Sequence, residues 1–174
     1  MEEGGFDQKT ALFLSVDEDS KEKQAWITAL RLLAATPKTR KEMAQKLADR
    51  GYAPNVVQQT LQQLEKQNIL DDRVYAANLL QRFRFMQPSG CGKMRFEMKR
   101  HGISSEIQEE LMGDWTKEEE FNRAKEAAQG RWERLSQLSP EKRTKKVYDF
   151  LARRGFDFQI CREVTAALGR IDED

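Results

Sequence analysis

The chain has 174 residues and a formal net charge of +1, with 39% hydrophobic and 34% charged residues. This composition is typical of a soluble, helix-rich protein, because no stretch approaches the roughly 18 apolar residues of a membrane span and the first residues lack the basic region of a signal peptide. The two cysteines have no metal-ligand spacing, so we expect a reduced protein in the cytoplasm.

We predict an all-α protein of three tandem three-helix repeats, similar to helix-turn-helix units, in an elongated array. No segment has the pattern of a strand. The repeats are predicted over residues 21–70, 71–116 and 117–174, after a flexible acidic arm at residues 1–20. A unit of about 50 residues buries little surface alone, so we expect each repeat to pack against its neighbour.

The first repeat opens with a helix that ends at Pro37. Its predicted inner face has apolar residues at helical spacing, namely Trp26, Ile27, Leu30, Leu33 and Ala34. Residues 39–42 are a capping box for a second helix, which is expected to end at Gly51. Pro54 suits the first turn of a third helix, and Asn68 closes it.

The second repeat opens with Asp71 as the expected N-cap. The apolar stripe of its first helix is predicted to be Val74, Tyr75, Leu79 and Phe83. Residues 87–90 break that helix, Met94 and Met98 take the inward positions of the second helix, and Ser104 caps the third.

The third repeat has a long first helix predicted over residues 121–138. Ser139 and Pro140 suit the N-cap and first position of its second helix, and Asp157 caps the last one. The expected inward residues are Val147, Leu151, Ile160, Val164 and Leu168. We also interpret Trp26, Trp115 and Trp132 as core residues.

One pattern recurs at the end of every second helix. A hydrophobic residue stands four positions before a glycine, a second hydrophobic residue follows the glycine, and a β-branched residue comes four positions later. The copies cover residues 47–56, 98–107 and 151–160, and their glycines are 51 and 53 residues apart. A fixed period of this size indicates stacked copies of one unit, an architecture that rarely carries a single catalytic cleft.

Catalytic constellations are absent from the sequence. His101, the one histidine, precedes a helix-ending glycine, where a surface role fits better than a catalytic one. Residues 89–93 lack the second half of a phosphate-binding loop and follow a helix rather than a strand. Residues 118–120 are three glutamates that suit the start of a helix. We therefore expect neither an enzyme nor a cofactor or metal site.

Charge is strongly segregated along the chain. Residues 1–24 carry seven acids against three bases, residues 71–102 seven bases against three acids, residues 103–120 seven acids against one base, and residues 138–155 six bases against two acids. A protein that binds duplex DNA alone tends to be basic throughout. The alternation instead indicates a partner with a mixed surface, or narrow basic strips between acidic faces.

The second helix of each repeat is the basic one, and residues 82–86 interleave arginines with aromatics as a platform for single strands would. Helical spacing places Phe83 in the core, which leaves Phe85 and the arginines as possible contacts. The candidate partner-binding residues are Arg82, Arg84, Lys93, Arg95, Lys99, Arg100, Lys145, Lys146, Arg153 and Arg154. Such residues could neutralise phosphates or engage an acidic protein groove; alternatively, they only solubilise an outer helix face.

These features resemble the RecX family, bacterial regulators of the RecA recombinase. The matching pieces are residues 71–76, Gly90 followed by residues 97–98 and 102–103, and residues 150–156, within a similarity that covers roughly residues 25–168. Cys91 stands where the family often has proline, methionines replace aliphatic residues at positions 94 and 98, and the acidic arm lies outside the resemblance.

The resemblance implies a non-enzymatic modulator that lies in the groove of a RecA–DNA filament and bridges adjacent protomers. Binding there would restrain ATP hydrolysis, filament growth and strand exchange in DNA recombination, repair and the SOS response. We expect a monomer that binds the RecA filament, binds single- or double-stranded DNA weakly on its own, and has no membrane partner. The alternatives are a helix-turn-helix-like regulator that binds duplex DNA and a scaffold that binds only proteins.

Overall fold

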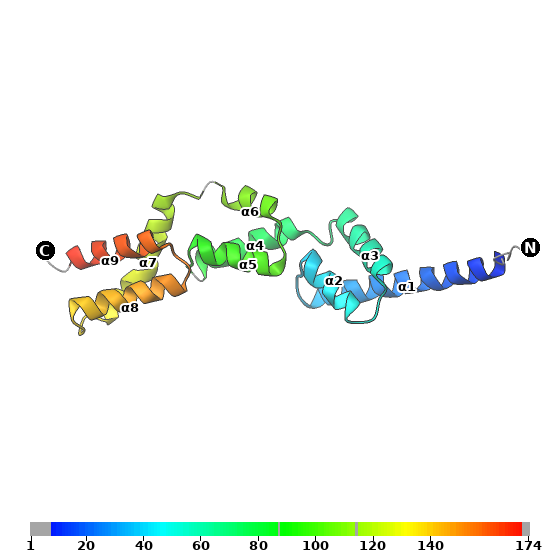
Figure 1. Cartoon of the computed structure of the whole chain (residues 1–174), viewed down its shortest axis with the longest axis horizontal. Coiled ribbons are helices and arrows are strands. Elements are labelled where there is room, and N and C mark those ends of the chain that lie inside the picture. The colour runs from blue at the N-terminus through cyan, green and yellow to red at the C-terminus, as the bar shows by residue number, and fades with distance from the viewer. Residues whose placement is uncertain (1–7, 87, 114, 172–174) are drawn as a thin grey trace, which may run out of the picture. The chain divides into compact units, whose positions relative to one another are not determined.

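The computed structural model describes residues 8–86, 88–113 and 115–171, with side chains only between residues 20 and 170 (Figure 1). Within these ranges every regular element is a helix and none is a strand, which confirms the all-α prediction. The helices are α1 (Gln8–Ala35), α2 (Arg40–Ala48), α3 (Pro54–Lys66), α4 (Asp72–Phe85), α5 (Cys91–His101), α6 (Ser105–Met112), α7 (Lys117–Arg134), α8 (Pro140–Arg153) and α9 (Phe158–Ile171). Among these helices, none combines the length and the apolar character that a membrane crossing requires.

Contacts divide the chain into two units, residues 1–75 and residues 76–174. Unit 1 contains α1, α2, α3 and the start of α4, and it corresponds to the first predicted repeat. Unit 2 contains the rest of α4 and α5 to α9, so the second and third predicted repeats belong to one unit. The elongated arrangement of the whole chain stays a prediction.

The N-terminal segment differs from the flexible arm that we expected at residues 1–20. Helix α1 begins at Gln8, so the backbone of residues 8–20 is helical, while residues 1–7 lie outside the described residues. The physical reason is that no glycine or proline occurs between residues 6 and 36, and nothing in the sequence stops the helix.

The recurring glycine pattern is a helix end of the Schellman type. Gly51, Gly102 and Gly155 have φ angles of 84°, 82° and 77°, in the left-handed region that glycine adopts without steric cost. In each copy the N–H after the glycine donates to the carbonyl five residues earlier, at 3.4 Å for Tyr52, 3.0 Å for Ile103 and 3.3 Å for Phe156. The three acceptors are Leu47, Met98 and Leu151, and all are buried.

Each unit has its own buried core. In unit 1 the core residues are Ala29, Met43, Leu47, Val57, Leu61, Leu64 and Leu70. In unit 2 the core around α7, α8 and α9 contains Ala124, Ala128, Trp132, Val147, Leu151, Phe156, Ile160, Cys161, Val164 and Leu168. The predicted inward residues Met94 and Met98 of α5 are also fully buried, and their flexible thioethers suit an irregular space.

Some predicted core positions are wrong. Ile27 is 48% exposed and Val74 is 56% exposed, because the buried faces of α1 and α4 are rotated from the predicted ones and bury Ala25 and Ala76 instead. Trp132 is buried as predicted, whereas Trp26 and Trp115 are half-buried. Helix α7 begins at Lys117 and ends at Arg134, earlier at both ends than predicted.

Candidate functional site

The four candidate residues of α5 differ in how exposed they are. Lys99 and Arg100 are exposed, while Arg100 pairs with Glu97 of the same helix at 2.6 Å. Arg95 is half-buried, and its guanidinium reaches Glu109 of α6 at 2.7 Å. Lys93 is half-buried beside Gly155. Among the four candidates on this helix, Lys99 is therefore the one most available to a partner.

The basic residues of α8 divide into exposed and structural ones. Lys145, Lys146 and Arg153 are exposed. Arg154 is half-buried: its guanidinium donates to the carbonyl oxygen of Pro88 at 2.9 Å and stacks 4.7 Å from the ring of Phe150. The neighbouring arginines thus differ: Arg153 is exposed, whereas Arg154 connects the end of α8 to the segment before α5 within unit 2.

A glycine joint connects the start of α5 to the turn between α8 and α9. The N–H of Gly90 donates to the carbonyl oxygen of Arg154 at 3.0 Å. A Cβ added at Gly90 would overlap the carbonyl oxygen of Gly155 and the backbone of Phe156. Only a residue without a side chain allows the two backbones to approach this closely.

A carboxylate from α7 binds the first turn of α5. The side chain of Glu120 is buried and accepts a hydrogen bond from the N–H of Cys91 at 3.0 Å. Burial, with the neighbouring Glu120 charge, raises the pKa of the Cys91 thiol to about 12. The thiol is therefore protonated at neutral pH and is not a nucleophile.

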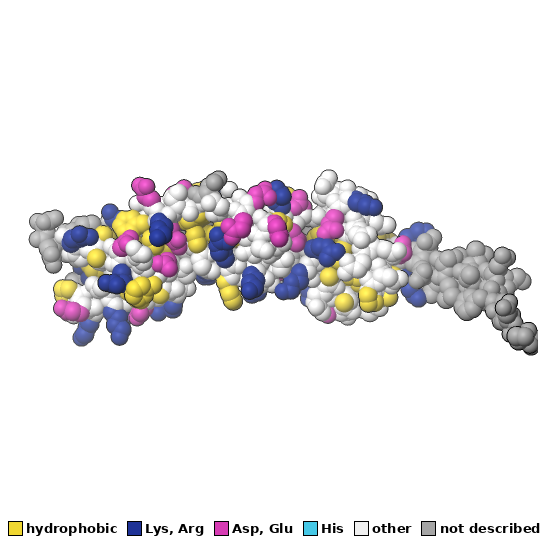
Figure 2. Space-filling model, turned by 45° about the horizontal axis from the view of Figure 1, so that its top comes forward, with side chains coloured by type: hydrophobic (Ala, Val, Ile, Leu, Met, Phe, Trp, Pro, Cys, Tyr) yellow, Lys and Arg dark blue, Asp and Glu magenta, His cyan; other side chains and the backbone are white. Residues whose placement is uncertain are grey.

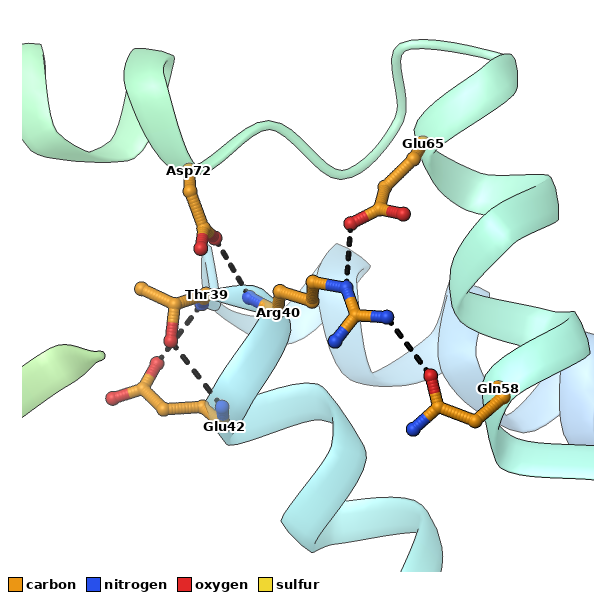
Figure 3. Close-up of polar contacts among 6 residues, drawn as sticks. All are labelled: Thr39, Arg40, Glu42, Gln58, Glu65 and Asp72. Atoms are coloured by element: carbon orange, nitrogen blue, oxygen red, sulfur yellow. Dashed lines mark hydrogen bonds and ion pairs between the residues drawn. The ribbon is translucent and has the colours of Figure 1, made fainter. Parts of the chain in front are cut away.

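The corresponding place in unit 1 is drawn in Figure 3. The N–H of Arg40, at the start of α2, donates to Asp72 at 2.7 Å. The Arg40 guanidinium pairs with Glu65 at 2.8 Å and donates to Gln58 at 2.9 Å. Burial raises the pKa of the Asp72 carboxyl, although the hydrogen bond from Arg40 opposes this shift. Both the N–H and the guanidinium of Arg40 therefore bind residues within unit 1.

The end of α4 presents an arginine on an aromatic ring. Arg82 and Arg84 are exposed, and Phe85 is 79% exposed, whereas Phe83 is buried as the helical spacing predicted. The guanidinium of Arg84 lies 4.9 Å from the ring centroid of Trp115. Arg123 of α7 lies 4.5 Å from the same centroid.

Arg123 fixes this arrangement. Its guanidinium donates to the carbonyl oxygen of Phe83 at 3.1 Å, which ties α7 to the end of α4. Burial and the nearby Arg84 charge lower the pKa of Arg123. Our sequence interpretation did not include Arg123 and placed Trp115 only in the core. No local pattern could have joined them to Arg84, which lies more than thirty residues away along the chain.

Charged side chains of both signs are mixed on the surface. On the face drawn in Figure 2, Lys and Arg side chains lie among Asp and Glu over both units. In the ranges that the structure describes, no three His, Cys, Asp or Glu side chains gather as they would around a metal ion. The candidate residues lie on α4, on α5, and on α8 or directly after it.

The fold and these surfaces define an all-α protein built from tandem helix-turn-helix-like domains. Family models for the first and third three-helix domains of RecX match residues 25–64 and residues 118–165. The chain belongs to the RecX family of regulatory proteins.

Relatives named Regulatory protein RecX match most of the chain. The one from Chlorobium phaeobacteroides (strain BS1) is 34% identical over 145 residues, covering 83% of this chain and 93% of the relative. The one from Prosthecochloris aestuarii is 29% identical over 147 residues, with the same two coverages.

Solved structures show the same fold. The crystal structure of RecX from Lactobacillus salivarius matches with a TM-score of 0.76 at 19% identity, covering 86% of this chain and 97% of that one. A second crystal structure, of a regulatory protein RecX, matches with a TM-score of 0.77 at 21% identity, covering 95% and 81%.

Proposed function

We propose that the protein is a non-enzymatic regulator of the RecA recombinase in the cytoplasm. It binds in the groove of RecA–DNA filaments as a monomer, bridges adjacent protomers, and inhibits ATP hydrolysis, filament growth and strand exchange. It needs no cofactor, and its contact with DNA alone is weak. The observation that carries this proposal is the similarity to regulatory RecX proteins over more than four fifths of the chain.

The surface charges support a partner of mixed composition. Lys99 on α5 and Lys145, Lys146 and Arg153 on α8 are exposed, so they can reach phosphate or carboxylate groups without any change in the fold. Acidic residues lie among the basic ones (Figure 2), which suits a protein–DNA filament better than bare DNA. Several weak contacts along a filament gain from effective concentration.

The charge of α6 weighs against a helix-turn-helix protein that reads duplex DNA. In such a protein the recognition helix enters the major groove. Helix α6 takes that place in the second repeat, and it carries Glu106, Glu109 and Glu110 but no base. These carboxylates would repel the phosphates of a duplex.

Co-sedimentation with ATP-bound RecA filaments tests the proposal. We expect strong binding to RecA-coated single strands and weak binding to bare duplex or bare single strands, measured at two salt concentrations. Tight binding to bare duplex would instead favour the DNA-binding regulator. Binding to none of the three would favour a scaffold that binds other proteins.

A charge-reversed variant connects the result to the surface. Lys99→Glu combined with Lys146→Glu should weaken filament binding and reduce its log–log salt dependence by about one per lost phosphate contact. Lys66→Glu combined with Lys117→Glu, at exposed positions of α3 and α7, changes the net charge by the same amount and is the matched control. Equal loss in the control would show that the net charge of the protein, rather than these positions, determines binding.

A further inference from the structure

The ring of Trp115 lines a pocket next to the candidate residue Arg84. This Trp115 pocket has a volume of about 430 Å³ and is lined by Arg84, Phe85, Trp115, Glu119, Arg123 and Glu126 among others. All of these residues belong to unit 2. Phe85, which lines the pocket, is 79% exposed, and the next residue, Met86, is 76% exposed.

The two arginines of the pocket, Arg84 and Arg123, make different contacts. Arg123 is half-buried and bound to the carbonyl oxygen of Phe83, so it holds the ring and the end of α4 in place. The exposed Arg84 guanidinium contacts the ring of Trp115 and forms no ion pair with any carboxylate in the part of the chain that the structure describes. Arg84 therefore offers its hydrogen-bond donors to a ligand.

The carboxylate of Glu119 interacts with the charge of Arg84, but its hydrogen bonds go to the start of α7. One oxygen of Glu119 accepts from the N–H of Thr116 at 3.0 Å and from its hydroxyl at 3.2 Å, which completes the capping box of α7. The backbone hydrogen bond lowers the pKa of Glu119, so this side chain is ionised and committed to the helix start.

The composition of the pocket favours a protein ligand over a nucleic acid. Aromatic residues, methionine and arginine are enriched in the cores of protein–protein interfaces, and tryptophan and arginine dominate their binding energy. A polyanion would bring several charges close to the carboxylates of Glu119 and Glu126 in the same pocket and would be repelled more strongly than a single carboxylate. A single carboxylate next to apolar groups fits both the charges and the exposed side chains.

We propose that the Trp115 pocket binds a segment of a protein partner in which an acidic side chain adjoins large apolar side chains. The carboxylate accepts hydrogen bonds from Arg84, whose planar guanidinium can donate two in parallel, and the apolar side chains cover Phe85 and Met86. Because the ring already orients Arg84, little side-chain entropy is lost on binding. This inference rests on the proposed function, because the partner segment would belong to a protein of the RecA filament.

The test uses the full chain, labelled with ¹⁵N, and two blocked tripeptides as probes. The acidic probe is glutamyl-leucyl-leucine, and the neutral control is glutaminyl-leucyl-leucine. The readout is the indole N–H resonance of Trp115, one of three tryptophans in the chain, assigned with a Trp115→Phe variant. We expect the acidic peptide to shift this resonance and the neutral peptide to bind about tenfold more weakly, as for one lost charge-assisted hydrogen bond.

Variants of the same chain separate the contact from the fold. Arg84→Gln should weaken the acidic peptide about tenfold, and Arg84→Lys, which keeps the charge without the planar fork, should lie between the two. Lys66→Gln removes one positive charge from unit 1 and should leave the affinity unchanged. The resonances of Trp26 and Trp132 report whether each variant is folded.

Three results would overturn the inference: no shift at millimolar peptide, equal shifts with the two peptides, or a shift with oligothymidylate in place of the peptides. The last would identify a nucleic-acid surface. Co-sedimentation keeps the two proposals apart. If the protein binds the acidic peptide but does not bind RecA filaments, the proposed function alone is refuted. If the protein does not bind the peptide and Arg84→Gln binds filaments as well as the wild type does, the proposal for the Trp115 pocket alone is refuted.

Discussion

The start of α2 in unit 1 and the start of α5 in unit 2 are closed in the same way. In each, the first N–H of the helix donates to a carboxylate from the helix that opens the next predicted repeat. Asp72 of α4 accepts from Arg40 at 2.7 Å, and Glu120 of α7 accepts from Cys91 at 3.0 Å. An oxygen acceptor is favourable there because the N–H groups at a helix start have no partner within the helix.

The two places differ in how much the helix depends on that carboxylate. Helix α2 also has a capping box of its own, in which Thr39 and Glu42 bind each other's N–H groups at 3.2 and 3.1 Å. Helix α5 has Gly90 at its N-cap and no side-chain cap. Helix α5 therefore relies on the third repeat for its start, which agrees with the second and third repeats forming one unit.

Gly90→Ala should reduce stability more than any other variant, because it breaks the closure of α5, and it has no counterpart at α2. The added Cβ would overlap the backbone of Gly155 and Phe156, so one segment must move. We expect a loss of about 3 kcal/mol in the free energy of unfolding, measured by urea unfolding, with hydrogen exchange accelerated in unit 2 only.

Gly130→Ala is the matched control, because Gly130 lies within α7 and an added Cβ would meet nothing within 4 Å. It should stabilise the protein by about 0.5 to 1 kcal/mol, since alanine is the better helix former. Equal stability of Gly90→Ala and the wild type would mean that the glycine joint is not closely packed.

A second pair of variants measures the two carboxylates directly. Glu120→Ala leaves a partly buried N–H of α5 without an acceptor and should cost about 2 kcal/mol. Asp72→Ala should cost about 1 kcal/mol, because α2 keeps its capping box and the site is only half-buried. Urea unfolding gives both values, and hydrogen exchange shows which unit opens.

Glu120→Gln retains an oxygen acceptor and should recover most of the loss seen in Glu120→Ala. If the two alanine variants cost the same, the capping box of α2 does not make up for the missing carboxylate, and the proposed difference between the units fails.

A smaller effect separates the two neighbouring arginines of unit 2. Arg154→Ala removes the hydrogen bond to Pro88 and the stacking on Phe150, and should cost about 1 kcal/mol. Arg153→Ala should change stability by less than about 0.5 kcal/mol, as is usual at exposed positions, but it should weaken filament binding. A stability loss in Arg153→Ala as large as in Arg154→Ala would contradict these assignments.

The sequence predicted what is local in this fold. The capping box at residues 39–42, the caps by Asp71, Ser104 and Asp157, and the left-handed glycines all depend on residues within a few positions of one another, and all are present. The buried pairs of the second helices were found for the same reason, because their spacing of four residues defines one helix face.

Long-range contacts could not be predicted in this way. Nothing in the sequence near Gly90 indicates that a turn more than sixty residues later approaches its backbone. The sequence around Arg154 is that of a surface cation, and it gives no sign of the hydrogen bond to Pro88. The rotated faces of α1 and α4 have a related cause. A sequence pattern assigns large apolar residues such as Ile27 and Val74 to the core, although alanines at neighbouring positions permit closer packing.

The smallest expected effect concerns the charge of Asp72 and its dependence on pH. Burial raises the pKa of this carboxyl in the folded protein, so the folded state binds the proton more tightly than the unfolded state does. The group therefore contributes stability below its unfolded pKa, and this contribution is lost as the pH rises through the folded pKa. Above that pH the ionised carboxylate has a net cost for folding, and Asp72→Asn removes the charge while keeping an oxygen acceptor for the N–H of Arg40.

We expect Asp72→Asn to stabilise unit 1 by about 0.5 kcal/mol at pH 7, a modest value because solvent screens a half-exposed group. The gain should vanish near pH 3, where the aspartate is protonated in both states. Urea unfolding of the variant and the wild type at both pH values measures the difference, and the effects of other titrating groups cancel in the comparison. A variant that is less stable than the wild type at pH 7 would show the opposite balance, in which the charged hydrogen bond to α2 outweighs the cost of burial.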